Sequence, residues 1–152
     1  MKLKKFDDMN CSLAQALDVI GERWTLLILR DVFLGIRRFD HIQADLGIAR
    51  NILAERLSRL IEEGILEKQQ IQGARFEYVL TEKGRDLRTV MLSITHWGDK
   101  HHANPKGARL TFVEVATGEP IAPMAVRAQD GRILGPDDIK AKRGPGMTGS
   151  SD

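Results

Sequence analysis

The fold is decided by the stretch Gly47-Ile-Ala-Arg-Asn-Ile-Leu-Ala-Glu-Arg-Leu-Ser-Arg-Leu-Ile-Glu-Glu-Gly-Ile-Leu-Glu-Lys-Gln-Gln-Ile-Gln-Gly-Ala-Arg-Phe-Glu-Tyr-Val-Leu-Thr81. Its first part predicts an amphipathic helix over residues 50–63, because apolar side chains recur there at helical spacing. These side chains are Leu53, Leu57, Leu60 and Ile61. Gly64 fits the position just after the helix, where a left-handed backbone is common.

Two strand-like runs, 65–71 and 75–80, follow this helix and are joined by the glycine-containing turn 72–74. A shorter helix is predicted before it, over 39–46, and Gly47 separates the two helices. Two short helices joined by a tight turn are typical of a helix-turn-helix, and the strand pair adds a wing. The stretch therefore predicts a winged helix-turn-helix, whose second helix can enter the major groove of DNA.

Three further helices are predicted around this stretch. Ser12-Leu-Ala-Gln15 has the form of a capping box and starts a helix that ends near Gly21. The helix over 22–33 is apolar over most of its surface and is expected at the centre of the core. Thr81 is expected to cap a long helix over 82–100. The apolar face of this helix is larger than the small core can cover. We therefore predict that it pairs with the same helix of a second subunit.

The fold class is therefore mainly α (α+β): a winged helix-turn-helix with a long C-terminal dimerisation helix and a small β-hairpin appendage. We assign residues 1–100 to one DNA-binding and dimerisation domain, in which 1–11 form an arm. Residues 101–108 contain a proline and polar side chains and are assigned to a linker.

The remaining residues differ in character from the helical part. We predict a small β-rich extension over 109–139, because 110–115 alternate between apolar and polar residues and Asp130-Gly131 is a strong hairpin signal. The tail 140–152 is rich in glycine, serine and charge, and we expect it to be disordered. The sequence assigns no role to the extension; a cover over a dimer and an effector-binding flap are both compatible with it.

Composition bounds the possible functions. The chain has 152 residues and a net charge of only +2, which by itself is weak support for a nucleic-acid partner. No apolar run approaches the ~18 residues of a membrane span, and the start lacks the apolar segment of a signal peptide, so a cytoplasmic protein is expected. The single cysteine, Cys11, excludes an internal disulfide, and the four histidines lack metal-motif spacing. We expect neither a metal nor a cofactor.

Short motifs occur in order along residues 11–100: Cys11, Ile20-Gly-Glu-Arg-Trp-Thr-Leu-Leu-Ile-Leu-Arg30, Gly35-Ile-Arg-Arg-Phe39, Leu46-Gly-Ile-Ala49, Leu53-Ala-Glu-Arg-Leu57, Glu63-Gly-Ile-Leu66 and Tyr78-Val-Leu-Thr-Glu-Lys-Gly84. Through this ordered combination the chain resembles the HxlR-type family of bacterial winged-helix regulators. The resemblance implies a homodimer that binds palindromic operators in double-stranded DNA and acts as a repressor or an activator.

The resemblance also implies a redox role for one residue, since some members sense oxidants or electrophiles through a cysteine at the position of Cys11. Two features depart from the family pattern. Ala49 stands where the family often has serine, and alanine is the weaker N-cap by about 1 kcal/mol. The extension also lacks the paired cysteines that some relatives carry there.

The predicted DNA-reading side of the helix over 50–63 follows from its buried stripe. With the leucines inward, the outward positions are Arg50, Asn51, Ala54, Glu55 and Ser58. Arginine suits guanine and asparagine suits adenine, each through two hydrogen bonds, and an alanine methyl can meet thymine. The alternative is that Arg50 and Asn51 only cap and solubilise a surface helix.

Four more side chains are predicted to contact DNA outside that helix. Arg37 and Arg38 precede the helix over 39–46, where they can clamp phosphates and fix the register; the alternative is a solvated basic pair. Gln72 and Arg75 lie at the wing and suit phosphate or minor-groove contacts.

The dimer interface is predicted from apolar residues of the first and last helices: Leu13, Leu87, Val90, Met91, Ile94 and Trp97. Cys11 lies just before a helix, where unpaired amides favour a thiolate, and is the candidate redox sensor. The alternative is a small residue that fills a crevice in the dimer. If Cys11 does react, the resolving thiol must come from a second subunit or a small molecule.

The sequence also bears on two other classes of function. An enzyme is not expected, because the sequence has no nucleophile motif, no phosphate-binding loop and no histidine cluster. A winged-helix protein-interaction module without DNA binding is the alternative function. Arg50, Asn51 and the Arg37-Arg38 pair favour DNA.

Overall fold

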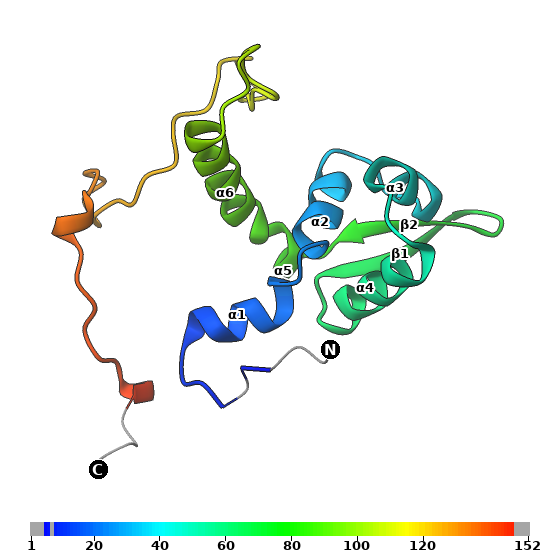
Figure 1. The fold of residues 1–152 in the computed structure, drawn as a ribbon, viewed down its shortest axis with the longest axis horizontal. Helices are drawn as coiled ribbons and strands as arrows, with labels where there is room; N and C mark the ends of the chain where they lie inside the picture. The colour runs from blue at the N-terminus through cyan, green and yellow to red at the C-terminus, as the bar shows by residue number, and fades with distance from the viewer. Residues whose placement is uncertain (1–4, 7, 148–152) are drawn as a thin grey trace. The chain divides into compact units, whose positions relative to one another are not determined.

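The computed structural model describes residues 5–6 and 8–147 (Figure 1). The chain divides into two compact units, 1–91 and 92–152, and each is described by itself. Parts of the expected arm (1–4 and 7) and of the expected tail (148–152) lie outside the described residues. No helix in the described part of the chain is long and apolar enough to cross a membrane.

The described elements confirm a mainly α winged helix-turn-helix with one antiparallel strand pair. The helices are α1 (Ser12–Ile20), α2 (Thr25–Phe33), α3 (Phe39–Leu46), α4 (Arg50–Glu62), α5 (Glu82–Arg85) and α6 (Leu87–His101). The strands are β1 (Leu66–Gln72) and β2 (Arg75–Leu80). Figure 1 shows the β1–β2 hairpin projecting beyond α3 and α4.

One hydrophobic core holds the first unit together. As predicted, α2 lies at its centre, since Ile28 and Leu29 are fully buried. Each leucine or isoleucine buried in this way stabilises the fold by roughly 1.5–3 kcal/mol. The core residues are Ile20, Ile28, Leu29, Val32, Ile42, Ile48, Leu53, Leu57, Leu60, Ile65, Leu66 and Tyr78.

A charged side chain also lies inside this unit. Asp31 of α2 is fully buried, and its Oδ1 accepts hydrogen bonds from Arg30 Nε at 3.0 Å and Nη2 at 2.6 Å. Among the described residues, its Oδ2 has no hydrogen-bond partner. Burial removes water from the carboxylate and raises the pKa of Asp31, while the Arg30 guanidinium partly opposes that effect.

The predicted starts of the first two helices are wrong. Cys11, not Ser12, is the N-cap of α1, and Gln15 Nε2 donates to the Met9 carbonyl at 3.1 Å instead of closing a capping box. The second helix begins at Thr25, because the Glu22 carboxylate accepts the Trp24 N–H at 3.0 Å and holds a turn before the helix. In both places a side chain bonds backbone outside the helix, which spacing alone does not reveal.

The hairpin is anchored at its base. Leu66 of β1 pairs with Leu80 of β2, and Leu66 and Tyr78 are buried there. The Tyr78 N–H donates to the Arg37 carbonyl at 2.8 Å, so the segment between α2 and α3 is fixed to the second strand. Near the tip, the strand register is irregular between Gln70 and Gln72. Gly73 follows with a φ of 59°, which residues that carry a side chain rarely adopt.

The predicted helix over 82–100 is two helices, α5 and α6, separated at Asp86. Thr81 caps α5 as predicted, with its Oγ1 accepting the Gly84 N–H at 3.1 Å. Gly84 packs so closely that a Cβ there would lie 2.2 Å from the Ile65 carbonyl oxygen. The single turn of α5 therefore packs against Ile65, just before β1, and α6 begins separately at Leu87.

The second unit holds the end of α6 and the extension, in which the predicted hairpins are reduced to isolated bridges. One bridge joins Val113 to Pro120 and the other joins Arg127 to Ile133. Asp130-Gly131 does form the predicted tight turn, with Gly131 at a φ of 89°. No β-strand occurs in the described residues after 101, and the other elements there are the short 3-10 turns Pro136–Asp138 and Pro145–Met147.

Candidate nucleic-acid interface

A sharp turn sets the angle between α3 and α4. Gly47 ends α3 in the left-handed conformation, with φ 60° and ψ 27°, and its N–H donates to the Gln43 carbonyl at 2.9 Å. Ile48 turns inward and is 3% exposed, so the turn is tied to the core. Together these residues form the helix-turn-helix that the sequence predicts.

The two sides of α4 are as predicted with one exception. Ile61, which was expected in the buried stripe, is 37% exposed, because it lies at the edge of that stripe, about 100° around the helix from Leu60. Leu53, Leu57 and Leu60 are at most 2% exposed and hold the helix against the core. The opposite side is exposed at all five positions expected to face outward: Arg50, Asn51, Ala54, Glu55 and Ser58. That edge is polar, carries one cation and one anion, and remains free of the core packing.

The start of α4 lies against the start of α3. The Arg50 guanidinium carbon lies 4.8 Å from the centre of the Phe39 ring, a distance typical of a cation–π contact. Ala49 is the N-cap and makes no side-chain cap bond, as its methyl group requires. The first-turn amides of α4 are therefore left without a side-chain acceptor, and such amides can bind an anionic oxygen.

Arg37 and Arg38 occupy different environments. Arg38 is the N-cap residue of α3, and its Nε lies 3.4 Å from Asp40 Oδ1, so part of its charge is compensated. Arg37 is exposed, and its backbone carbonyl is fixed by Tyr78. The predicted pair thus has one exposed side chain, Arg37, and one held beside α3, Arg38.

The wing carries a second cation besides the predicted Arg75, but it also carries Glu67 and Glu77, so its net charge is zero. Gln72 and Arg75 are exposed near its tip, as predicted. Lys68 of β1 is not among the predicted contacts, yet it is also exposed, and its ammonium lies 4.6 Å from the centre of the Phe76 ring. Two-residue alternation along β1 could have found it, because Lys68 and Gln70 share one face of the strand.

Two arginines of α4 have structural partners instead. Arg56 Nε lies 3.0 Å from Glu22 Oε2, an ion pair with both side chains largely buried. Arg59 Nη2 donates to the Asp18 carbonyl at 3.1 Å. Both side chains connect α4 to the segments around α1, so neither belongs to its free edge.

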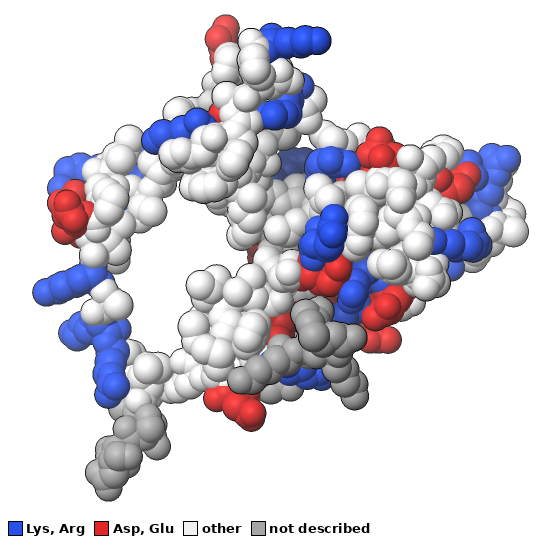
Figure 2. Space-filling model, in the orientation of Figure 1, with Lys and Arg blue, Asp and Glu red and all other residues white. Residues whose placement is uncertain are grey.

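Charge over this unit is mixed. Figure 2 shows basic and acidic side chains interspersed across the helices, with Lys and Arg present at the end that carries the hairpin. Three-residue groups of His, Cys, Asp or Glu able to hold a metal are absent from the described part of the chain. A turn fixed to the core, a helix with one free polar edge and a two-stranded wing are the parts of a winged helix-turn-helix, a fold typical of transcriptional regulators.

Comparison with known proteins agrees with this class. The model of the HxlR-like helix-turn-helix family matches residues 19–106, and the chain belongs to that family. An HTH-type transcriptional regulator of Mycobacterium tuberculosis is 36% identical over 138 residues, which cover 90% of this chain and 87% of the relative.

Two solved structures are also similar. The crystal structure of the candidate transcription factor PA1607 has a TM-score of 0.82 and 40% identity, and the match covers 88% of this chain and 95% of that one. The redox regulator HypR in its reduced form has a TM-score of 0.56 and 26% identity, covering 60% of this chain and 94% of that one. The PA1607 and mycobacterial matches reach well beyond the winged helix.

Proposed function

We propose that this protein is a homodimeric, sequence-specific DNA-binding regulator that places α4 of each subunit in a major groove. The observation that carries the proposal is the division of α4 into a leucine side in the core and a free polar edge. Arg50 and Asn51 are the side chains on that edge suited to reading bases, and Ala54 offers a methyl group. Glu55 and Ser58 continue the same edge.

Contacts to phosphates would come from the surrounding segments. Arg37 is exposed beside the start of α3, and Arg75 is exposed at the wing. Such contacts fix the position of the protein on the duplex without reading its sequence. Lys68 and Gln72 would extend the same role along the wing, whereas Arg38 already shares its charge with Asp40.

The homodimer is supported by apolar side chains that the subunit leaves exposed. On α6, Ile94 is 51% and Trp97 60% exposed, and Val90 is 39% exposed; on α1, Leu13 is 68% exposed. Two other residues predicted for this interface, Leu87 and Met91, are partly buried against the subunit's own core. A two-fold pair would place two recognition helices about one turn of DNA apart, ~34 Å, and would match a palindromic operator.

A binding assay with the intergenic DNA beside the protein's own gene tests this proposal. Arg50→Ala should weaken specific binding and relax the preference at one base pair, at a cost of roughly 1–3 kcal/mol. Arg37→Ala should weaken binding to all sequences and lower the salt slope by about one. Arg143→Ala, which removes the same charge from an exposed position outside the segments proposed to contact DNA, is the matched control.

Unchanged operator affinity in both variants would contradict this orientation of α4. The alternative function, a winged helix that binds a protein, predicts a shallow salt dependence, because protein contacts release few counterions. A steep slope that Arg37→Ala reduces favours DNA.

Redox control through Cys11 is the finer part of the proposal. Cys11 is exposed and is the N-cap residue of α1, and the similar protein HypR is named as a redox regulator. An oxidant should weaken operator binding by the wild type and leave Cys11→Ser unaffected. Equal loss of binding in both proteins would show that Cys11 is not the sensor.

A further inference from the structure

The extension is ordered without a core of its own. Its turns are hydrogen-bonded: the Ile121 N–H donates to Phe112 at 3.0 Å, and the Leu134 N–H donates to Val126 at 2.9 Å. Yet no described residue from 102 to 147 is buried. Fixing a chain costs roughly 1–2 kcal/mol per residue in backbone entropy, which isolated turns do not offset. Packing that this unit does not itself supply must therefore cover the segment.

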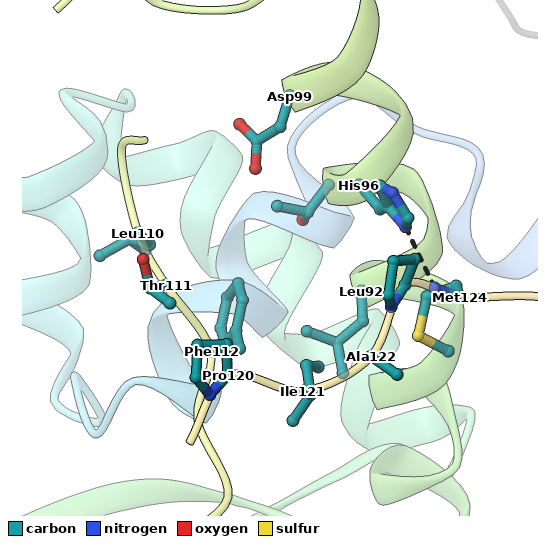
Figure 3. Close-up of a pocket in the computed structure, with 12 residues that line it drawn as sticks. Leu92, His96, Asp99, Leu110, Thr111, Phe112, Pro120, Ile121, Ala122 and Met124 are labelled. Carbon is teal, nitrogen blue, oxygen red and sulfur yellow. Dashed lines mark hydrogen bonds between the residues drawn. The ribbon is translucent and has the colours of Figure 1, made fainter. Parts of the chain in front are cut away.

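The root of the extension is attached to α6. The Met124 N–H donates to His96 Nδ1 at 3.1 Å, and Arg109 Nη1 lies 3.5 Å from Asp99 Oδ1. Figure 3 shows the segments around Phe112 and Ile121 facing this helix across a shallow groove of about 200 Å³. These contacts set the direction in which the rest of the segment leaves α6.

Beyond those contacts the extension presents large apolar side chains to solvent. Val115, in the first turn, is 100% exposed, Ile133 is 64% exposed and Val126 is 58% exposed. Single exposed apolar residues are ordinary on a protein surface, but three of them on a segment with no buried residue are characteristic of an uncovered interface.

We infer that residues 109–139 form an arm that packs on a second copy of this chain, against the apolar faces that α1 and α6 expose. This inference rests on the proposed homodimer and extends it. Between 109 and 139 the chain has three arginines and five carboxylates, a net charge of −2 that disfavours DNA as the occupant. A second copy supplies matching apolar faces: Leu13, Leu17, Ile94 and Trp97 are exposed in every subunit.

A substitution at Val115 distinguishes an effect on dimerisation from an effect on the folding of the subunit. Because Val115 is fully exposed in one chain, Val115→Glu leaves the folded subunit unchanged but places a charge in the inferred contact. Sedimentation equilibrium on the full chain should show a dimer dissociation constant at least tenfold higher. Ala116→Glu puts the same charge on the exposed neighbouring residue of the same turn and should change it less than twofold.

A second measurement identifies the chain that the arm contacts. A nitroxide on Ala116→Cys in a Cys11→Ser chain is mixed with an isotope-labelled chain that carries no nitroxide. Broadened signals from α1 or α6 of the labelled chain are expected. A stable dimer with no such broadening and an unchanged constant for Val115→Glu would overturn the arm and leave the homodimer intact. A wild-type chain that stays monomeric at all concentrations would overturn the homodimer, and the arm with it.

Discussion

The winged-helix part and the extension differ in what holds them in place. In the first, apolar side chains from α2, α3, α4 and the hairpin meet in one cluster, and Leu53 is fully buried within it. In the second, the apolar residues alternate along the chain, but Ile133 is still 64% exposed. Similar apolar content therefore produces a core in one region and an uncovered surface in the other.

This difference shows that hydrogen bonds alone do not explain the second region. Each hydrogen bond contributes about 0.5–1.5 kcal/mol net, because water competes for the same groups. The winged helix adds the burial of a dozen core side chains to its hydrogen bonds. The extension has turns without that burial, so its stability should depend on a partner.

The largest expected contrast is between truncations of Leu53 and Ile133. Leu53→Ala removes fully buried methyl groups and should lower the free energy of unfolding by about 2–5 kcal/mol. Ile133→Ala should change that of the separated subunit by less than about 0.5 kcal/mol. Urea unfolding at several protein concentrations measures both free energies. The effect of Ile133→Ala should appear only at concentrations at which the subunits associate. Equal losses would mean that the extension has a core of its own.

A smaller contrast is expected between two glycines. A Cβ on Gly84 would lie 2.2 Å from the Ile65 carbonyl oxygen and 3.0 Å from Leu80 Cδ2, so backbone must move. Gly84→Ala should therefore destabilise the protein by about 1–3 kcal/mol. At Gly135, a Cβ would meet only Asp138 Oδ2 at 3.4 Å, and the backbone φ of −80° suits alanine. The melting temperature of Gly135→Ala should therefore match that of the wild type. If both variants lost stability to the same extent, the close packing of Gly84 would not be the cause.

The smallest expected effects concern two aspartates with opposite pKa shifts. Burial raises the pKa of Asp31 above its ordinary 3.8, so the folded protein holds that proton more tightly than the unfolded chain. The stability this group contributes is present below pH 3.8 and is lost as the pH rises through the raised pKa. Asp31→Asn should escape that loss, and its stability relative to wild type should increase from pH 4 to pH 7.

Asp130 provides the control in the extension. Hydrogen bonds from Arg132 lower its pKa, so its contribution would be present above pH 3.8 and lost as the pH falls through the lowered value. The group is fully exposed, however, and solvent screens such pairs. Urea titrations of Asp130→Asn between pH 4 and pH 7 should parallel the wild type. If the stability of Asp31→Asn also paralleled that of the wild type over this pH range, the pKa of Asp31 would not be raised.

Local periodicity predicted the winged helix well. The spacing of Leu53, Leu57 and Leu60 identified both the buried side of α4 and its free edge, because a regular helix fixes which residues share a face. It did not predict the break at Asp86, since the close contact of Gly84 with Ile65 depends on residues far apart in the sequence. Lys68 could have been predicted, because two-residue alternation along β1 places it on the same face as Gln70.

The extension was harder to predict for the same physical reason. Alternation over 110–115 indicated a strand, and the structure has a single bridge between Val113 and Pro120 there. A strand forms only when a neighbour pairs with it, and two short strands without a packed face are marginal in water. The turn at Asp130-Gly131 was predicted correctly, because a tight turn depends mainly on its own residues.

The sequence by itself determined the helix-turn-helix, the wing and the family, since these follow from residue spacing and from motifs in a fixed order. Only the tertiary structure decided which apolar residues find a neighbour: Leu87 and Met91 join the core, while Trp97 and Val115 remain exposed. The reason is that periodicity belongs to a segment, whereas burial belongs to pairs of segments, and no single segment encodes its partner.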